Sequence, residues 1–336
     1  MKNGSPETLQ EAIQYFSDEQ ICIDTMARIR WAEGKPICPA CEHTDLWYLA
    51  KQHRFKCKEC WKQFTVKMGT LMEDSPIPLS KWFPALWMIV NDKNGISSYE
   101  LGKALKITQK SAWFVLHRLR TALQTGSFEK KMGGPGGIVE SDETFIGGKA
   151  ENMHKSRKLR IQRLRNEIPD WKATIRGYDK AAVHGILDRN ERKVRAKVVP
   201  NVKRETLQSA ILEHVAHGSM VCTDEANAYH NLPHQYVHEV VNHMQEYVRG
   251  QIHTNGMENF WSLLKRTLRG TYVAVEPFHL QKYVDEQVFR YNYRGGKKKE
   301  DRITDGQRFE MALSRLSGKR LTYDELTGKE GGTQPF

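Results

Sequence analysis

Four cysteines constrain the fold of this chain more than any other feature of its sequence. They form two CxxC pairs, Cys38–Cys41 and Cys57–Cys60, with fifteen residues between the pairs. This spacing is typical of a zinc ribbon, in which four thiolates surround one Zn²⁺ ion and stabilise a module too small to own a core. An iron–sulfur centre is the main alternative, and a chance arrangement is a more distant one. Because four cysteines fill the coordination sphere, we expect the zinc to be structural.

The cysteine module also carries basic side chains suited to DNA. The sequence predicts short strands there, with each CxxC at a tight turn, and a basic surface formed by Arg54, Lys56, Lys58 and Lys62. The chain of 336 residues has a formal net charge of +12. This charge favours a polyanionic partner such as nucleic acid, although an ordinary basic protein has the same property. The remaining thiols, Cys22 and Cys222, stand alone and are interpreted as buried structural residues.

Residues 96–123 have the pattern of a helix-turn-helix. Ser97 and Glu100 form a capping box before one apolar-periodic helix, and Thr108 caps a second, basic helix after a short turn. In a DNA-binding pair of this kind, the start of the second helix reaches the base edges. We therefore expect DNA contacts from Gln109, Lys110 and Ser111. A helical linker domain without DNA-binding function has a similar pattern and is the alternative.

Three acidic residues in the second half of the chain form a candidate metal site. Asp142 and Asp224 each lie at or near the end of an apolar strand, and Glu258 lies at the start of a later helix. Singly, each aspartate is more typical of a cap or a turn. Together, carboxylates that end neighbouring strands and begin a nearby helix can hold two Mg²⁺ ions, for which Mn²⁺ can substitute. This arrangement serves in-line phosphodiester chemistry.

The stretch HTNGMENFWSLLKR, residues 253–266, places Lys265 seven positions after Glu258. Seven residues are nearly two helical turns, so the two side chains are expected on one face. An intrahelical charge pair is the simpler interpretation of this spacing. If the three acids bind metal, Lys265 instead contacts a DNA phosphate, and Arg266 and Arg269 extend the same cationic strip.

Five motifs occur in order along the chain: CPAC…CKEC, VESDETFIGGK, TDEANAY, HTNGMENFWSLLKRTLRGTY and HLQKYVDEQVFRYNYR. Together they resemble those of bacterial insertion-sequence transposases of the ISXO2-like type, over most of residues 30–295. The resemblance implies a zinc ribbon before an RNase H-like catalytic domain. It also implies a DDE-type triad followed by a lysine, which correspond here to Asp142, Asp224, Glu258 and Lys265.

Two positions vary within this family: the third catalytic position and the residue that follows a tyrosine further along the chain. Asparagine or histidine can occupy the third catalytic position, and here Asn255 and His253 lie close to Glu258 in the sequence. Val273 stands where the family often has a histidine after a tyrosine. The third ligand is therefore expected to be Glu258, alone or with a contribution from one of these neighbours.

The resemblance implies a DNA transposase. Such an enzyme binds the terminal inverted repeats of its element, cleaves DNA strands with Mg²⁺, and joins the 3′-OH ends to target DNA. Because two ends are joined in one event, we expect a homodimer or a larger assembly on DNA. Two alternatives stay open. An RNase H-like nuclease without strand transfer would keep the acidic triad, whereas a non-catalytic zinc-ribbon and helix-turn-helix regulator would not need it.

The sequence predicts an α/β protein with several domains. No apolar run approaches the length of a membrane span, and the N-terminus MKNGSPETLQ lacks the features of a signal peptide. We therefore expect a bacterial cytoplasmic, DNA-associated protein without a membrane partner. The expected domains are an N-terminal helical segment at 1–33, a zinc ribbon at 34–68, a helix-turn-helix domain at 69–132, an RNase H-like mixed sheet flanked by helices at 133–296 with a basic insertion at 149–176 that follows the DNA backbone, and a C-terminal basic tail at 297–336.

Overall fold

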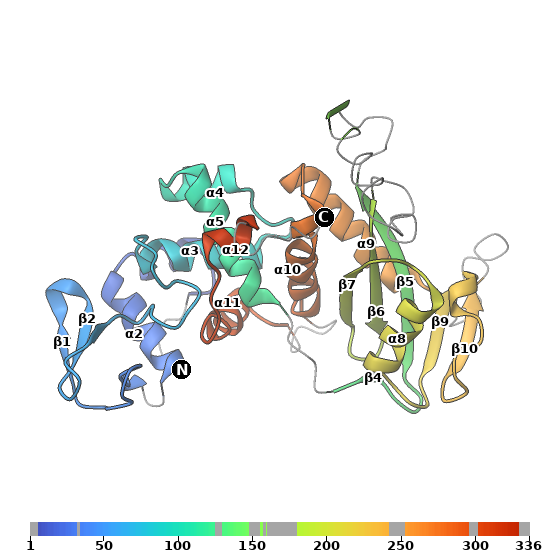
Figure 1. Cartoon of the computed structure of the whole chain (residues 1–336), viewed down its shortest axis with the longest axis horizontal. Helices are drawn as coiled ribbons and strands as arrows, with labels where there is room; N and C mark the ends of the chain where they lie inside the picture. The colour runs from blue at the N-terminus through green and yellow to red at the C-terminus, as the bar shows by residue number, and fades with distance from the viewer. Residues whose placement is uncertain are drawn as a thin grey trace. The chain divides into compact units, whose positions relative to one another are not determined.

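The computed structural model describes residues 6–31, 34–124, 130–147, 155–156, 159, 180–241, 253–295 and 302–328. The chain divides into two compact units, Met1–Gln124 with Tyr293–Phe336, and Thr125–Asn292 (Figure 1). Almost all of the basic segment 149–176 lies outside the described residues. No helix in the described ranges is both long and apolar enough to span a membrane.

The first unit combines a small antiparallel sheet with a group of helices. The sheet has the order β1-β2-β3, and each strand pairs with its neighbour in the sequence. The elements of this unit are α1 (Leu9–Tyr15), α2 (Glu19–Arg30), β1 (Leu46–Leu49), β2 (Arg54–Cys57), β3 (Gln63–Phe64), α3 (Leu79–Asn91), α4 (Ser98–Leu105), α5 (Gln109–Leu123), α11 (Asp305–Ser314) and α12 (Tyr323–Thr327).

The core of the first unit contains residues from both the early and the late part of the sequence. Phe309 of α11 lies 5.2 Å from Phe16 and 5.5 Å from Trp87, measured between ring centroids. All three rings are buried. Thr304 and Gln307 form a capping box that starts α11, which explains why a helix begins there. Part of the segment for which the sequence predicts a basic tail is therefore a helix in the core of this unit.

Helices α4 and α5 are joined by a tight turn with the local geometry that the sequence predicts. Ser97 and Glu100 form the capping box of α4, and the Thr108 hydroxyl accepts the N–H of Ser111 at the start of α5. The turn brings the Ile107 carbonyl close to Gly102, where a Cβ would lie only 3.1 Å from its oxygen. A side chain there would force the turn to shift by a few tenths of an ångström, so glycine fits this close approach best.

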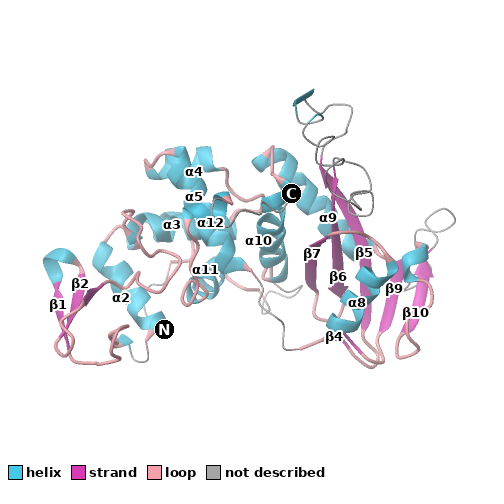
Figure 2. Ribbon diagram, viewed as in Figure 1, coloured by secondary structure: helices cyan, strands magenta, loops and turns pink. Residues whose placement is uncertain are grey.

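The second unit is built on a five-stranded mixed sheet of order β10-β9-β5-β6-β7 (Figure 2). β5, β6 and β7 are antiparallel neighbours, whereas β9 runs parallel to both β5 and β10. This mixed α/β topology is consistent with the RNase H-like domain that the resemblance implies. The elements are β4 (Met132–Gly133), β5 (Ile138–Gly147), β6 (Lys180–Asp188), β7 (Lys193–Val199), α8 (Arg204–His214), β8 (Val215–Ala216), β9 (Met220–Asp224), β10 (Val237–Val241), α9 (Asn255–Thr267) and α10 (Leu280–Asn292).

Helices cover both faces of this sheet. Buried residues of β6 and β7 pack with α9 and α10 in one cluster that includes Val183, Phe260 and Val288. On the other face, Val139 and Val221 pack with Leu207 and Ile211 of α8. Successive residues of a strand face opposite sides of a sheet, so the even-numbered residues of β5 face α9. Glu140 and Asp142 are two of these residues.

Helix α9 lies very close to the sheet because β6 has a glycine opposite Asp142. Gly185 pairs with Asp142 across the two strands. A Cβ on Gly185 would lie 2.3 Å from the Met257 Cε atom and 2.8 Å from ring atoms of Trp261. Any larger residue would push α9 away from the sheet, so this glycine sets the distance between α9 and β5.

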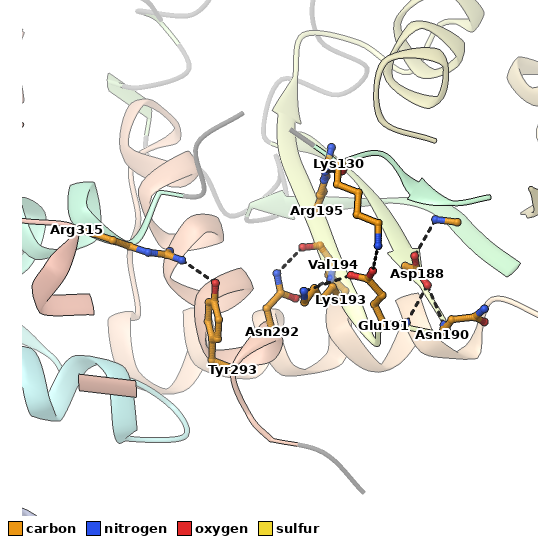
Figure 3. Close-up of polar contacts among 11 residues, drawn as sticks. Lys130, Asp188, Asn190, Glu191, Lys193, Val194, Arg195, Asn292, Tyr293 and Arg315 are labelled. Carbon is orange, nitrogen blue, oxygen red and sulfur yellow. Dashed lines mark hydrogen bonds and ion pairs between the residues drawn. The ribbon is translucent and has the colours of Figure 1, made fainter. Parts of the chain in front are cut away.

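Polar side chains fix the β6–β7 hairpin and its contact with α10 (Figure 3). The Asp188 carboxylate accepts the N–H groups of Asn190 and Glu191 in the turn at 2.8 and 3.0 Å. The Asn292 side chain bonds both the N–H and the carbonyl of Val194, at 2.7 and 2.9 Å. The end of α10 is thereby held against β7.

Candidate active site

Asp142 lies in the middle of β5, not at the end of a strand as the sequence predicts. β5 stays paired with β6 as far as Gly147. What ends beside Asp142 is the parallel pairing with β9, which runs only from Ile138 to Glu140. An apolar run in the sequence cannot show where a neighbouring strand stops, which explains the error.

Asp224 and Glu258 occupy the places that the sequence predicts. Asp224 is the last residue of β9, and its carboxylate accepts the N–H of Ala226 at 3.0 Å. Glu258 lies in the first turn of α9 with an exposed side chain. Both are electrostatic neighbours of Asp142, so the fold brings three carboxylates from two strands and a helix to one region.

The carboxyl group of Asp142 is held in a position that disfavours its charge. The pKa of Asp142 is raised to about 6, chiefly by burial and also by the negative charges of Asp224 and Glu258. Hydrogen bonds from the Glu143 backbone N–H and from the indole of Trp261 oppose this rise. The indole Nε1 lies 2.9 Å from the Asp142 Oδ2 atom. A buried acid with negative neighbours fits a site that binds a cation.

A cavity of about 570 Å³ adjoins these residues, and its lining combines acidic and basic side chains. Glu258 and Lys265, for which the sequence predicts a shared helix face, both line it. Asp224 is not among its lining residues. The lining residues are Asp142, Glu143, Thr144, Glu258, Trp261, Ser262, Lys265, Arg266 and Arg269.

The three carboxylates are too far apart to enclose a metal ion by themselves, but their spacing is compatible with Mg²⁺. In the part of the chain that the structure describes, the one set of His, Cys, Asp or Glu ligand atoms close enough to hold an ion is the cysteine set. Mg²⁺ usually takes only one or two carboxylates directly and fills its other positions with water and substrate oxygens. The separation of Asp142, Asp224 and Glu258 is therefore compatible with Mg²⁺ that is bound together with a substrate.

Three neighbouring residues that the sequence singles out do not line the cavity. His253 is engaged elsewhere, because its Nδ1 atom lies 2.9 Å from the Arg189 guanidinium and 3.5 Å from the Glu140 carboxylate. Asn255 is exposed at the first position of α9. Val273 is 79% exposed with φ +60°, a conformation that a β-branched residue rarely adopts.

Glu140 is a structural residue of the site that the sequence analysis misses. Its carboxylate is only 1% exposed and lies 2.6 Å from the Nε atom of Arg189, which is 16% exposed. The other carboxylate oxygen accepts the N–H of Met257 in the first turn of α9 at 2.8 Å. The negative charge therefore lies at the positive end of the α9 dipole, next to Glu258. The signal in the sequence is an acid two residues before Asp142, on the same face of the strand.

Glu143 forms a second interaction that the sequence does not reveal. The Tyr229 hydroxyl donates to its Oε2 atom at 2.6 Å. The pKa of Glu143 is raised to about 7, chiefly by burial and also by the charges of Asp224 and Asp142, while this hydrogen bond opposes the rise. Glu143 is therefore a third carboxyl group of the cavity, beside Asp142 and Glu258. The two partners are 86 residues apart in the sequence, so only the fold brings them together.

The four cysteines of the first unit form the cluster that the sequence predicts. Their Sγ atoms all lie within 4.8 Å of one another. Cys38 and Cys57 are buried, Cys60 is partly buried and Cys41 is exposed. This is the ligand set of a structural zinc site. Cys22 and Cys222 are both fully buried, as expected of structural thiols.

The predicted DNA-binding side chains are at least partly exposed, and several have local partners. Arg54 and Lys62 are exposed, while Lys56 and Lys58 are partly covered. Gln109 donates to the Ser98 hydroxyl at 2.9 Å, and Lys110 lies 4.9 Å from the centre of the Tyr323 ring. Ser111 accepts a hydrogen bond from Thr108 at 2.9 Å.

Comparisons with known proteins find one matching family domain in each of the two units. Residues 135–292 match the ISXO2-like transposase domain, and residues 17–63 match the transposase zinc-ribbon domain. An uncharacterized protein in the transposable element ISH50 of Halobacterium salinarum is 25% identical over 262 residues, which cover 76% of this chain and 85% of that protein. An uncharacterized transposase-like protein of Haemophilus influenzae is 34% identical over 101 residues, which cover 30% of this chain and 81% of that protein.

The cysteine cluster predicts a metal content of one zinc ion per chain. Cys57→Ser should lower the zinc measured by plasma mass spectrometry to well below one equivalent and lower the melting temperature of the ribbon, because the metal supplies folding energy in such modules. Cys22→Ser is the matched control. The Cys22 thiol donates to the Phe16 carbonyl at 3.4 Å, a bond that serine can also make, so this variant should keep its zinc. Iron in place of zinc would contradict the assignment.

The Glu140–Arg189 pair predicts a large loss of stability when its charge is removed. Glu140→Gln should lower the free energy of unfolding of the second unit by roughly 2–4 kcal/mol, because one partner of a buried ion pair and a helix-capping acceptor are weakened together. Urea denaturation measures this change. Glu191→Gln is the control, because Glu191 pairs with exposed Lys130 at a similar distance of 2.8 Å (Figure 3), and the midpoint should barely move. Equal effects of the two substitutions would contradict the role given to Glu140.

The raised pKa of Asp142 predicts that the difference in melting temperature between Asp142→Asn and the wild type depends on pH. The native state holds a proton on Asp142 up to about pH 6, whereas an unfolded aspartate loses it near pH 4, at about 3.9. The stability from this group is present below the unfolded pKa and is lost as the pH rises through about 6. Without divalent cations, Asp142→Asn should therefore melt a few degrees above the wild type at about pH 8, and this difference should shrink toward about pH 5. Differential scanning fluorimetry measures both.

Mg²⁺ should reverse that order at about pH 8, because a cation between the carboxylates stabilises only the protein that keeps its charge. A wild-type melting temperature that does not respond to Mg²⁺ or Mn²⁺, even with bound DNA, would contradict a cation site at Asp142.

Proposed function

The chain belongs to the ISXO2-like transposase family, and we propose that it cleaves DNA at the ends of a mobile element and joins the freed 3′-OH ends to target DNA. The observation that supports this proposal most is the cavity that is lined both by the carboxylates of Asp142 and Glu258 and by the cations of Lys265, Arg266 and Arg269. The carboxylates suit metal ions, and the cations suit the phosphates of a DNA strand.

Asp142, Asp224 and Glu258 are the proposed catalytic carboxylates. Two Mg²⁺ ions held there would activate the attacking hydroxyl and neutralise the charge that develops on the leaving oxygen. Asp142 is rigidly held, since Trp261 donates to its Oδ2 atom at 2.9 Å. Glu258 follows Met257, whose N–H is bound by buried Glu140, so the helix that carries this ligand is fixed to the same strand as Asp142.

Lys265, Arg266 and Arg269 are the proposed phosphate-binding residues of the cavity. Lys265 follows Glu258 by seven residues on α9, and Arg269 follows it by eleven, just beyond the end of α9 at Thr267; both line the cavity. Their charges would hold the scissile strand beside the carboxylates, and contacts of this kind fix the register of the substrate. Glu143, which accepts a hydrogen bond from Tyr229, lines the same cavity.

The first unit is the proposed DNA-binding part. The zinc ribbon presents Arg54, Lys56, Lys58 and Lys62, and α5 presents Gln109, Lys110 and Ser111 at its N-terminal end. We propose that these two surfaces recognise the terminal inverted repeats. Since both ends of an element are joined together, the active form would be at least a homodimer on DNA.

Cleavage of end-containing DNA tests the catalytic assignment. Asp224→Asn should abolish strand cleavage with Mg²⁺, by more than about a hundredfold, while DNA binding persists in a mobility-shift assay. Glu225→Gln is the matched control, because it removes the charge of the adjacent exposed acid and should cleave like the wild type. Normal cleavage by Asp224→Asn would overturn the assignment. Binding without cleavage by the wild type would instead favour a non-catalytic regulator.

Strand joining separates a transposase from a nuclease with the same fold. In the same assay, a pre-cut end with a free 3′-OH is supplied with target plasmid, and the wild type should give joined products while Asp224→Asn gives none. Cleavage without any joined product would favour the nuclease.

A further inference from the structure

Two exposed tryptophans lie together on the outer surface of the zinc ribbon. Trp47 of β1 is 41% exposed and Trp61 is 61% exposed, and their ring centroids are 5.5 Å apart. Lys56 faces Trp47 across the β1–β2 pair. Its Nζ atom lies 4.9 Å from the centre of the Trp61 ring and 5.7 Å from that of Trp47. The three side chains form one patch, called here the tryptophan patch.

The backbone at Trp61 has a left-handed conformation that favours glycine and is unfavourable for a bulky residue. Trp61 directly follows Cys60 and has φ +60°, and Glu42, which follows Cys41, has the same value. The turn after each CxxC pair therefore imposes a left-handed conformation, and a bulky residue there is strained. A large apolar ring that is strained and also left in water does not stabilise the ribbon. Its presence is explained better by a contact with another molecule.

The charges around the tryptophan patch select a polyanion. Lys58 lies 5.5 Å from the centre of the Trp47 ring and pairs with the exposed Asp45 carboxylate at 2.6 Å. Arg54 and Lys62 are exposed on the same small sheet and its turn. Cations beside exposed aromatic faces are the combination that binds single-stranded nucleic acid, in which bases stack on the rings and phosphates meet the cations.

The exposed ring faces favour unpaired bases over duplex DNA. In a duplex each base is covered above and below by its neighbours, so a protein reaches only base edges and the backbone. A ring face can be matched only by a base that has left the stack. The zinc site keeps the strands that carry Trp47 and Lys56 rigid, so the patch is formed before the ligand arrives.

We propose that Trp47 and Trp61 stack on unpaired bases of a DNA strand, while Lys56 binds an adjacent phosphate. This inference rests on the proposed function, in which DNA strands are cut and the freed 3′-OH ends are joined to target DNA. It adds to that function a surface for a single strand, separate from the duplex contacts expected of α5.

Binding of a labelled oligothymidylate, compared with a blunt hairpin duplex by fluorescence anisotropy, tests the proposal. Trp61→Ala should weaken single-strand binding about 5- to 100-fold, which is the usual effect of removing one stacking ring, and should leave duplex binding within about twofold. Trp61→Phe should restore most of the affinity. Phe278→Ala removes another exposed aromatic ring, 41% exposed, outside the zinc ribbon, and should bind both probes like the wild type.

Trp61→Gly separates binding from stability. Glycine adopts φ +60° without strain, so this variant should melt no lower than Trp61→Ala and keep its zinc, yet bind the single strand as weakly. Lys56→Gln should reduce the slope of log K against log salt by about 0.7 for the single strand, because one phosphate contact is lost.

Three results would overturn the inference: unchanged single-strand binding by Trp61→Ala, equal losses for single strand and duplex, or restored binding in Trp61→Gly. None of these results affects the cleavage test on Asp224→Asn. The two proposals can therefore fail independently.

Discussion

The buried carboxylate of Glu140 is the interaction on which the geometry of the second unit depends. It joins three elements at once, because it lies on β5, pairs with Arg189 after β6, and accepts an N–H from the first turn of α9. An ion pair this deeply buried is weak as a source of stability, since desolvation offsets most of the attraction. The contribution of this carboxylate is to position the elements that it contacts. The carboxylate determines where α9 begins, and the position of Glu258 follows from that.

The same face of β5 carries a second acid with the opposite electrostatic situation. Glu140 has a cation and a helix N-terminus beside it, whereas Asp142, two residues further, has the negative charges of Asp224 and Glu258 near it, which hydrogen bonds from the Trp261 indole and the Glu143 N–H partly offset. The charge of Glu140 is thereby satisfied within the protein, whereas Asp142 keeps a raised pKa. Gly185 completes this arrangement, because its missing side chain allows α9 to bring Trp261 to Asp142.

The first unit owes its order to a different constraint. Its small sheet has few apolar residues to bury, so the four thiols and their metal replace a core. The helices beside it are held by aromatic packing that includes Phe309 from the far end of the sequence. A ribbon that is stabilised by four metal ligands tolerates the strained backbone at Trp61 and its exposed ring.

The sequence by itself determined the local structure and the chemistry. Periodicity and caps gave α4, α5 and α9 within a few residues, and cysteine spacing gave the thiol cluster. These features depend on contacts between near neighbours, which a single sequence displays. Only the tertiary structure decided the rest: where β9 ends beside Asp142, that Glu140 binds Arg189 and α9, that Tyr229 meets Glu143, and that Trp47 and Trp61 lie together. Each of these is a pairing across strands or helices, and such pairings are set by sheet register and close packing, which no local pattern encodes.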